Sequence, residues 1–191
     1  MKNKPSTGAI FLDRDGVLIK RPHPTWKKSQ LELQSGAAGF VHFLNTRNIP
    51  VVVITNQAVV ARGLISEAGV SKLHDSIQKN LERKGSFINR FYFCPHHREA
   101  TLSKYRKKCS CRKPEIGLYK KAKKDLKINF RKSFTIGDMT QDILAGDRAG
   151  VTTILLKKGH QGKDGKYKVT PDYEAKNFKE VLKILKNHGI K

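Results

Sequence analysis

A chain of 191 residues is long enough to bury the core of one domain, and it has no apolar run as long as a signal peptide or a membrane-spanning helix. Its charge is unusual, because 39 Lys and Arg residues stand against 16 Asp and Glu residues and leave a formal net charge of +23. We therefore expect a cytoplasmic protein with a single domain over residues 1–191 and no role at a membrane. Its partners would be phosphorylated or polyanionic molecules, unless the lysines only coat a solvated surface.

Five short apolar segments have the composition of β-strands. Four of them are rich in β-branched residues and do not alternate with polar residues, as is typical of parallel strands buried on both faces. These four are residues 8–13, 51–54, 133–138 and 151–156. The fifth, FINRFYFC at residues 87–94, ends at the first cysteine of the chain.

Amphipathic patterns between these segments indicate five helices. They cover residues 37–48, 66–84, 115–126, 141–150 and 177–188. Strands that alternate with helices predict an α/β fold, in which right-handed crossovers place helices on both faces of a parallel sheet. We expect residues 159–168 to form a mobile loop, to which the sequence assigns no role.

Four of the sixteen acidic residues follow two of the predicted strands. Asp13 and Asp15 come after the first strand, and Asp138 and Asp142 after a later one. Ligand sites in open α/β sheets lie beyond the carboxyl ends of the strands, and carboxylates that converge there repel one another unless a cation neutralises them. An all-oxygen set of ligands suits Mg²⁺. Taken alone, an Asp at the end of a strand is more often a turn or helix-cap residue than a metal ligand.

The residue types beside these aspartates suit phosphoryl transfer. A carboxylate next to Mg²⁺ can attack phosphorus to give an aspartyl-phosphate, while a second carboxyl protonates the leaving oxygen and then activates water. A hydroxyl and amides follow the second strand, at Thr55, Asn56 and Gln57. Together with a cation, they could stabilise the charge of the transferred group.

All three cysteines lie in the basic segment 94–111, with the spacing C-x-H-x12-C-x-C. A disulfide is unlikely to persist in the cytoplasm, and three cysteines cannot all pair. Three thiolates and one imidazole form a closed tetrahedral Zn²⁺ set, and zinc would supply the folding energy that this polar segment lacks. Reactive thiols and scattered core cysteines are the alternatives. The spacing alone does not decide between His96 and His97.

The segments IFLDRDG, VITNQ, CRKP and IGDMTQDILAG resemble the four motifs of the haloacid-dehalogenase-like (HAD) phosphatases. More narrowly, the chain resembles heptose 1,7-bisphosphate phosphatases and their histidinol-phosphate phosphatase relatives, from about residue 8 to residue 156. The resemblance implies a Rossmann-like three-layer sandwich with a central parallel sheet, a zinc-binding loop at 94–111 and no large cap domain.

The resemblance also implies roles for single residues. Asp13 would be the nucleophile, Asp15 the general acid and base, Thr55 a contact of the phosphoryl group and Lys113 the cation beside it. Asp142 would orient Lys113 or a metal-bound water. The expected ligands are Asp13, Asp138 and the backbone carbonyl of Asp15 for Mg²⁺, and Cys94, His96, Cys109 and Cys111 for Zn²⁺. The expected substrate contacts are Arg14, Arg21, Asn56, Gln57 and Arg112. The zinc would thus fix the loop that carries Arg112 and Lys113.

Three departures from the family pattern lie where the leaving group is recognised. Ala58-Val59 replaces the usual Ser-Gly, Val17 stands where Thr is usual, and Met139 stands where the family often has a substrate-binding lysine. None affects the nucleophile, the acid or the metal ligands, so we expect the reaction to survive. Lys20, Arg21 or Lys27 would then replace the missing lysine.

These observations predict a Mg²⁺-dependent phosphomonoesterase that removes the 7-phosphate of D-glycero-D-manno-heptose 1,7-bisphosphate. Histidinol phosphate and the 3′ ends of nucleic acids are the alternative substrates, and a non-enzymatic scaffold is the alternative class. The partner would be a small phosphorylated sugar, with only non-specific binding of nucleic acid through the net charge. We expect a monomer.

Overall fold

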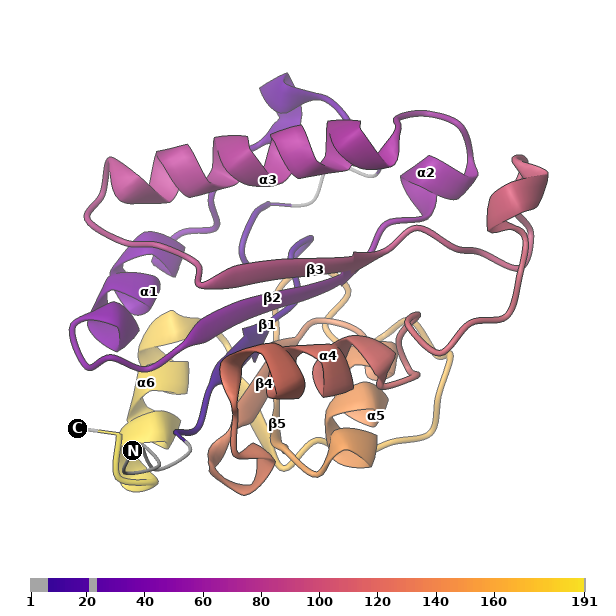
Figure 1. Cartoon of the computed structure of the whole chain (residues 1–191). Coiled ribbons are helices and arrows are strands. Elements are labelled where there is room, and N and C mark those ends of the chain that lie inside the picture. Colours follow the sequence, from indigo (N-terminus) through magenta and orange to yellow (C-terminus); the bar gives the residue numbers. More distant parts are fainter. Residues whose placement is uncertain (1–6, 21–23, 191) are drawn as a thin grey trace, which may run out of the picture.

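The computed structural model describes residues 7–20 and 24–190, so Arg21, one of the expected substrate contacts, lies outside the described residues. Six parallel strands form one sheet in the order β3-β2-β1-β4-β5-β6 (Figure 1). They are β1 (Ile10–Leu12), β2 (Val51–Asn56), β3 (Arg90–Cys94), β4 (Phe134–Gly137), β5 (Thr152–Leu156) and β6 (Tyr173–Ala175). The five predicted strands are confirmed. The edge strand β6 was not predicted, because only one of its three residues is buried.

Helices cover both faces of the sheet, as predicted (Figure 1). They are α1 (Ala37–Asn45), α2 (Ala58–Ala61), α3 (Glu67–Glu82), α4 (Gly117–Leu126), α5 (Thr140–Ala149) and α6 (Phe178–Asn187), with 3-10 turns at Lys28–Gln30, Ser103–Tyr105 and Phe130–Lys132. α1, α3 and α6 pack on one face, and α4 and α5 on the other. The predicted three-layer α/β fold is therefore confirmed, and the one-turn helix α2 is an addition.

Capping residues set several helix boundaries. The Ser66 hydroxyl accepts a hydrogen bond from the Gly69 amide at 3.0 Å and starts α3, and the Asn177 side chain accepts one from the Glu180 amide at 3.1 Å and starts α6. Gly150 ends α5 with a φ of 71°, a left-handed conformation that glycine adopts without strain.

Both faces of the central strand β1 are buried, which explains why apolar and polar residues do not alternate in its sequence. Ile10 and Leu12 pack into the core under α1, α3 and α6, whereas Phe11 packs into the core under α4 and α5. All three side chains are at most 1% exposed. Burying a side chain of this size contributes about 1.5–3 kcal/mol, so both cores stabilise the strand that precedes Asp13.

No cap domain is inserted anywhere in residues 7–20 and 24–190. Instead, the segment between β3 and α4 extends beyond the carboxyl ends of the strands (Figure 1). Within the same residues, no helix has the length and apolar character that crossing a bilayer would require.

The sheet brings three strand ends together. β1 pairs with β2 on one side and with β4 on the other, so the residues at the carboxyl ends of these strands are neighbours. They are Asp13 after β1, the pair Thr55-Asn56 at the end of β2 and Asp138 after β4. The chain also reverses its direction across the sheet between β1 and β4, which is where open α/β sheets leave a ligand-binding crevice.

Candidate active site

Three buried carboxylates converge at this crevice. Asp13, Asp138 and Asp142 each place an oxygen within 4.8 Å of the others, and they are 7%, 0% and 1% exposed. The ammonium of Lys113 contacts Asp13 Oδ1 at 2.8 Å and Asp142 Oδ1 at 2.7 Å. One positive charge against three carboxylates leaves negative charge in a buried site, and a divalent cation with oxygen ligands fits this donor set.

Lys113 is held at three points and stays charged. Besides the two carboxylates, its ammonium donates to the Ile54 carbonyl at 2.7 Å. Burial alone would lower the pKa of Lys113, but the negative charges of Asp13 and Asp142 outweigh it and the pKa is raised. The site therefore keeps a fixed positive charge beside Asp13.

Asp142 has a partner for each carboxylate oxygen. Oδ1 contacts the Lys113 ammonium, and Oδ2 accepts a hydrogen bond from the Met139 amide at 3.1 Å, which caps α5. Burial raises the pKa of Asp142, and Lys113 opposes this rise. Asp142 is thus a helix cap and a partner of Lys113 at the same time.

The Asp15 carboxylate is not one of these three clustered carboxylates, and two neighbours hold it. Arg14 donates to both Asp15 oxygens at 3.1 Å, and Gln57 donates to Asp15 Oδ2 at 2.7 Å. Arg14 also donates to the Gln57 side chain at 2.7 Å. The substrate contact expected from Arg14 does not fit this arrangement, because its side chain is fully buried and its donors are bound to protein groups.

His74 on α3 lies behind Arg14 and was not predicted to belong to the site. Its Nε2 is 3.4 Å from Arg14 Nη1, and its ring stacks on Phe91 with centroids 4.7 Å apart and meets the edge of Phe93. Burial, aided by the charge of Arg14, lowers the pKa of His74 to about 3. A neutral histidine therefore backs the arginine that holds Asp15.

The pKa of His74 predicts that acid weakens the fold. The unfolded chain has the ordinary histidine pKa of 6.5, so between pH 6.5 and 3 it binds a proton that the folded protein does not. This contribution to stability is fully present above pH 6.5, and about 2 kcal/mol of it is lost by pH 5. Urea unfolding at pH 7 and pH 5 measures the loss. His74→Phe, which keeps a ring between Phe91 and Phe93, should lose about 2 kcal/mol less, and equal losses would contradict the prediction.

A cavity of about 230 Å³ lies over these groups. Asp13, Asp15, Thr55, Asn56, Gln57 and Arg112 line it, as expected from the sequence, together with the unpredicted Arg62, His97 and Lys166. Thr55 accepts a hydrogen bond from Gln57 at 2.8 Å, and the Asn56 side chain accepts one from the Lys113 amide at 3.0 Å. Residues 55–57, at the carboxyl end of β2, thus connect Asp15 with Lys113.

The three cysteines and His96 form a second cluster. Sulfur–sulfur distances are 2.9–3.5 Å, and His96 Nδ1 is 3.3 Å from Cys111 Sγ. A tetrahedral zinc site with Zn–S bonds of about 2.3 Å needs sulfurs about 3.8 Å apart, so a small expansion would admit the ion. The hydrogen bond with Cys94 lowers the pKa of Cys111 to about 5, whereas the same bond, together with burial, raises the pKa of Cys94. This cluster has the donor set of a structural zinc site, whereas His97 Nδ1 faces the Glu99 amide.

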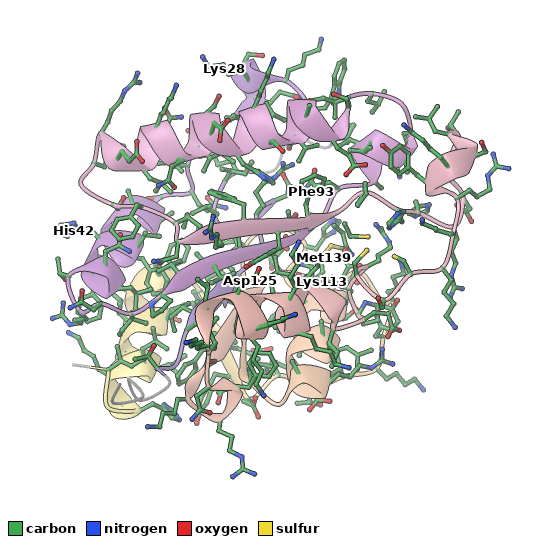
Figure 2. All side chains as sticks on the ribbon, in the orientation of Figure 1. Lys28, His42, Phe93, Lys113, Asp125 and Met139 are labelled. Atoms are coloured by element: carbon green, nitrogen blue, oxygen red, sulfur yellow. The ribbon has the colours of Figure 1, made fainter. Side chains whose placement is uncertain are left out.

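The cysteine cluster borders the cationic residues of the site. Arg112 follows Cys111 directly and donates to the His96 carbonyl at 3.0 Å. Figure 2 shows Lys113 and Met139 near the carboxyl ends of the strands, beside the yellow sulfur atoms. Lys113 thus lies two residues after Cys111, the last cysteine of the cluster.

Residues 159–168, which the sequence predicted as a mobile loop without a role, contact the candidate site. The His160 amide donates to Asp138 Oδ2 at 2.9 Å, and the Gly162 amide donates to the Asp138 carbonyl at 2.8 Å. Gly159 has a φ of 54°, and a Cβ there would lie 2.1 Å from Asp138 Oδ2. This loop packs directly against Asp138.

Of the three cations expected to replace the missing lysine, Arg21 lies outside the described residues, and Lys20 and Lys27 have local partners instead. Lys20 pairs with Glu32, and the Lys27 ammonium lies 4.6 Å from the centroid of the Trp26 ring. Neither is among the described residues that line the cavity, whereas Met139 and Lys166 are. Lys20 and Lys27 were suggested by their charge near the first motif, but their side chains bind local partners.

Known proteins resemble the chain in sequence and in fold. Residues 110–181 match the HAD-hydrolase-like family. The chain is 39% identical over 147 residues to D-glycero-beta-D-manno-heptose-1,7-bisphosphate 7-phosphatase of Rhodopseudomonas palustris, which covers 77% of this chain and 82% of that protein. It is 36% identical over 151 residues to D-glycero-alpha-D-manno-heptose-1,7-bisphosphate 7-phosphatase of Photorhabdus laumondii, with 78% and 82% covered.

A crystal structure shares the fold over almost the whole chain. It is the D,D-heptose 1,7-bisphosphate phosphatase from B. bronchiseptica, complexed with magnesium and phosphate. The TM-score is 0.82 at 24% identity, with 95% of this chain and 99% of that chain covered.

Proposed function

Because the chain belongs to the heptose-1,7-bisphosphate 7-phosphatase family of HAD-like hydrolases, we propose that it is a Mg²⁺-dependent phosphatase that removes the 7-phosphate of D-glycero-D-manno-heptose 1,7-bisphosphate. The observation that carries this proposal is the convergence of Asp13, Asp138, Asp142 and Lys113 beneath a cavity that Asp15 also lines. A nucleophile, an acid and a cation are then within reach of one phosphate group.

The proposed ligands of Mg²⁺ are Asp13, Asp138 and the backbone carbonyl of Asp15. Asp142 has both oxygens engaged by Lys113 and Met139, which supports a role in orienting Lys113. Bound Mg²⁺ would offset the repulsion between the Asp13 carboxylate and an incoming phosphate. The magnesium and phosphate in the B. bronchiseptica structure support this metal.

In the proposed reaction, an Asp13 carboxylate oxygen attacks phosphorus, and the bond from phosphorus to the sugar oxygen breaks. Asp15 donates its proton to that oxygen, so the sugar leaves as an alcohol. Asp15 then takes a proton from water, which attacks the aspartyl-phosphate and releases inorganic phosphate and the Asp13 carboxylate. Thr55 and Lys113 would donate hydrogen bonds to the phosphoryl oxygens. Arg14 and Gln57 would position Asp15.

Zn²⁺ is proposed to bind Cys94, His96, Cys109 and Cys111 and to have a structural role. The reduced thiols that such a site needs support the expected cytoplasmic location. Nucleic acid would bind only through the net charge of +23, outside the catalytic cycle and in a salt-dependent way.

The proposal is tested by phosphate release from a panel of substrates. The panel contains both anomers of heptose 1,7-bisphosphate, histidinol phosphate, fructose 1,6-bisphosphate and a 3′-phosphorylated oligonucleotide. We expect the highest kcat/KM with one heptose anomer, and no turnover when Mg²⁺ is omitted. A higher kcat/KM with histidinol phosphate or with the oligonucleotide would contradict the proposed substrate. Turnover that does not need Mg²⁺ would contradict the proposed mechanism.

A further inference from the structure

Three cations from separate parts of the chain line the same cavity. Arg62 follows α2, Arg112 follows the cysteine cluster, and Lys166 belongs to the loop that packs against Asp138. His97 lies among them in the wall of the same cavity.

No carboxylate of the described residues forms an ion pair with Arg62, Arg112 or Lys166. Lys113 differs, because Asp13 and Asp142 balance its charge. The cavity thus has an acidic, metal-binding floor and a second region with surplus positive charge. Cations that gather without counterions repel one another, and an anionic ligand would relieve that repulsion.

There is room for a ligand to extend past these residues. His97, Arg112 and Lys166 also line a neighbouring cavity of about 510 Å³, which runs over the zinc-loop side of the molecule. A molecule with one phosphate at Asp13 can therefore reach the cations with a second anionic group.

The loop that carries Lys166 is fixed to the site. Asp164 accepts hydrogen bonds from the Thr140 amide and hydroxyl, each at 2.8 Å, and the Tyr167 amide donates to the Thr140 hydroxyl at 3.2 Å. Thr140 lies two residues after Asp138. The backbone on either side of Lys166 is therefore tied to the segment that carries the proposed metal ligand.

We propose that Lys166 and Arg62 join Arg112 to bind the second, non-reacting phosphate of a bisphosphate substrate, with Lys166 in the place that the apolar Met139 leaves without a cation. This proposal rests on the proposed function, since it takes the substrate to carry two phosphates. It makes Lys166 a specificity-determining residue that contacts the substrate away from the reacting bond.

The test compares substrates with one and two phosphates. The variants are Lys166→Ala and Arg62→Ala, with Lys163→Ala as the matched control, because Lys163 is exposed in the same loop and does not line the cavity. Loss of one charged contact should raise KM for the heptose bisphosphate about tenfold while kcat stays within about twofold. KM for p-nitrophenyl phosphate, which has one phosphate, should change much less than KM for the bisphosphate. Lys166→Arg should restore most of the affinity.

An unchanged KM for the bisphosphate, or equal effects on both substrates, would overturn the proposal. A wild-type protein that hydrolyses p-nitrophenyl phosphate but not the heptose bisphosphate would overturn the proposed function instead. In that case we would compare how strongly the heptose bisphosphate and heptose 7-phosphate inhibit the hydrolysis of p-nitrophenyl phosphate. Stronger inhibition by the bisphosphate that is lost in Lys166→Ala would support the anion site. Equal inhibition by the two sugars in the wild type, or a difference that persists in Lys166→Ala, would overturn it.

Discussion

Asp13→Asn is expected to lower kcat by about 10⁴-fold or more, with the fold intact. An amide oxygen cannot act as the nucleophile, and loss of a nucleophile removes most of the catalysis that depends on it. The substitution also removes one of the three clustered carboxylates, two of which contact Lys113. Without Mg²⁺, thermal stability should therefore stay the same or rise, because the repulsion is smaller.

Mg²⁺ provides a second readout for the same variant. A ligand that binds only the folded state raises the melting temperature of the protein. Because Asp13 is a proposed Mg²⁺ ligand, Mg²⁺ should raise the melting temperature of the wild type more than that of Asp13→Asn. Asp75→Asn, the same chemical change at an exposed position of α3, should match the wild type in kcat and in the response to Mg²⁺. Residual activity above about 1% of wild type in Asp13→Asn would show that another group is the nucleophile.

His96→Ala and Cys109→Ser are each expected to abolish zinc binding and to lower kcat/KM by about 100-fold or more. Structural zinc supplies much of the folding energy of a small polar segment, and Arg112 and Lys113 follow directly after the cluster. Without zinc these cations lose their positions, and removal of one group that stabilises developing charge costs about 10²–10³ in rate.

Trypsin shows whether the segment loses its order. Arg98, Lys104, Arg106, Lys107 and Lys108 lie within it, so cleavage at these residues should be slow with zinc and fast without it. His97→Ala is the matched control, and it should keep zinc and resist trypsin. If His96→Ala keeps zinc and His97→Ala loses it, the zinc ligand is His97 and not His96. Full activity in a variant without zinc would show that catalysis does not require the cluster.

The strand-end aspartates were predictable because two simple regularities coincide there. Continuous β-branched runs mark strands buried on both faces, and parallel strands end at one edge of the sheet. Asp13, Asp138 and Asp142 thus converge as local patterns suggested. The cysteine cluster was predictable for a similar reason, since close pairs of ligands need little information from distant parts of the chain.

Arg14 and Lys166 were not predictable in the same way. The charge of Arg14 suggested a phosphate contact, and the structure shows that the fully buried side chain holds Asp15 instead. Lys166 lies in a loop with positive φ at Gly159, Gly162 and Gly165, a composition that is equally typical of a flexible linker. Its position depends on hydrogen bonds to Asp138 and Thr140, which no local pattern encodes.

Lys113 already has three close partners before any substrate arrives. Its ammonium donates hydrogen bonds to Asp13 Oδ1 and to the Ile54 carbonyl, and it forms an ion pair with Asp142 Oδ1 at 2.7 Å. An ammonium has only three hydrogens, so a phosphoryl oxygen competes with these partners for Lys113. In the proposed reaction the contact with Asp13 weakens, because that carboxylate loses its charge when it bonds to phosphorus. The Ile54 carbonyl and Asp142 would then keep the ammonium in place while it donates to the phosphoryl oxygen.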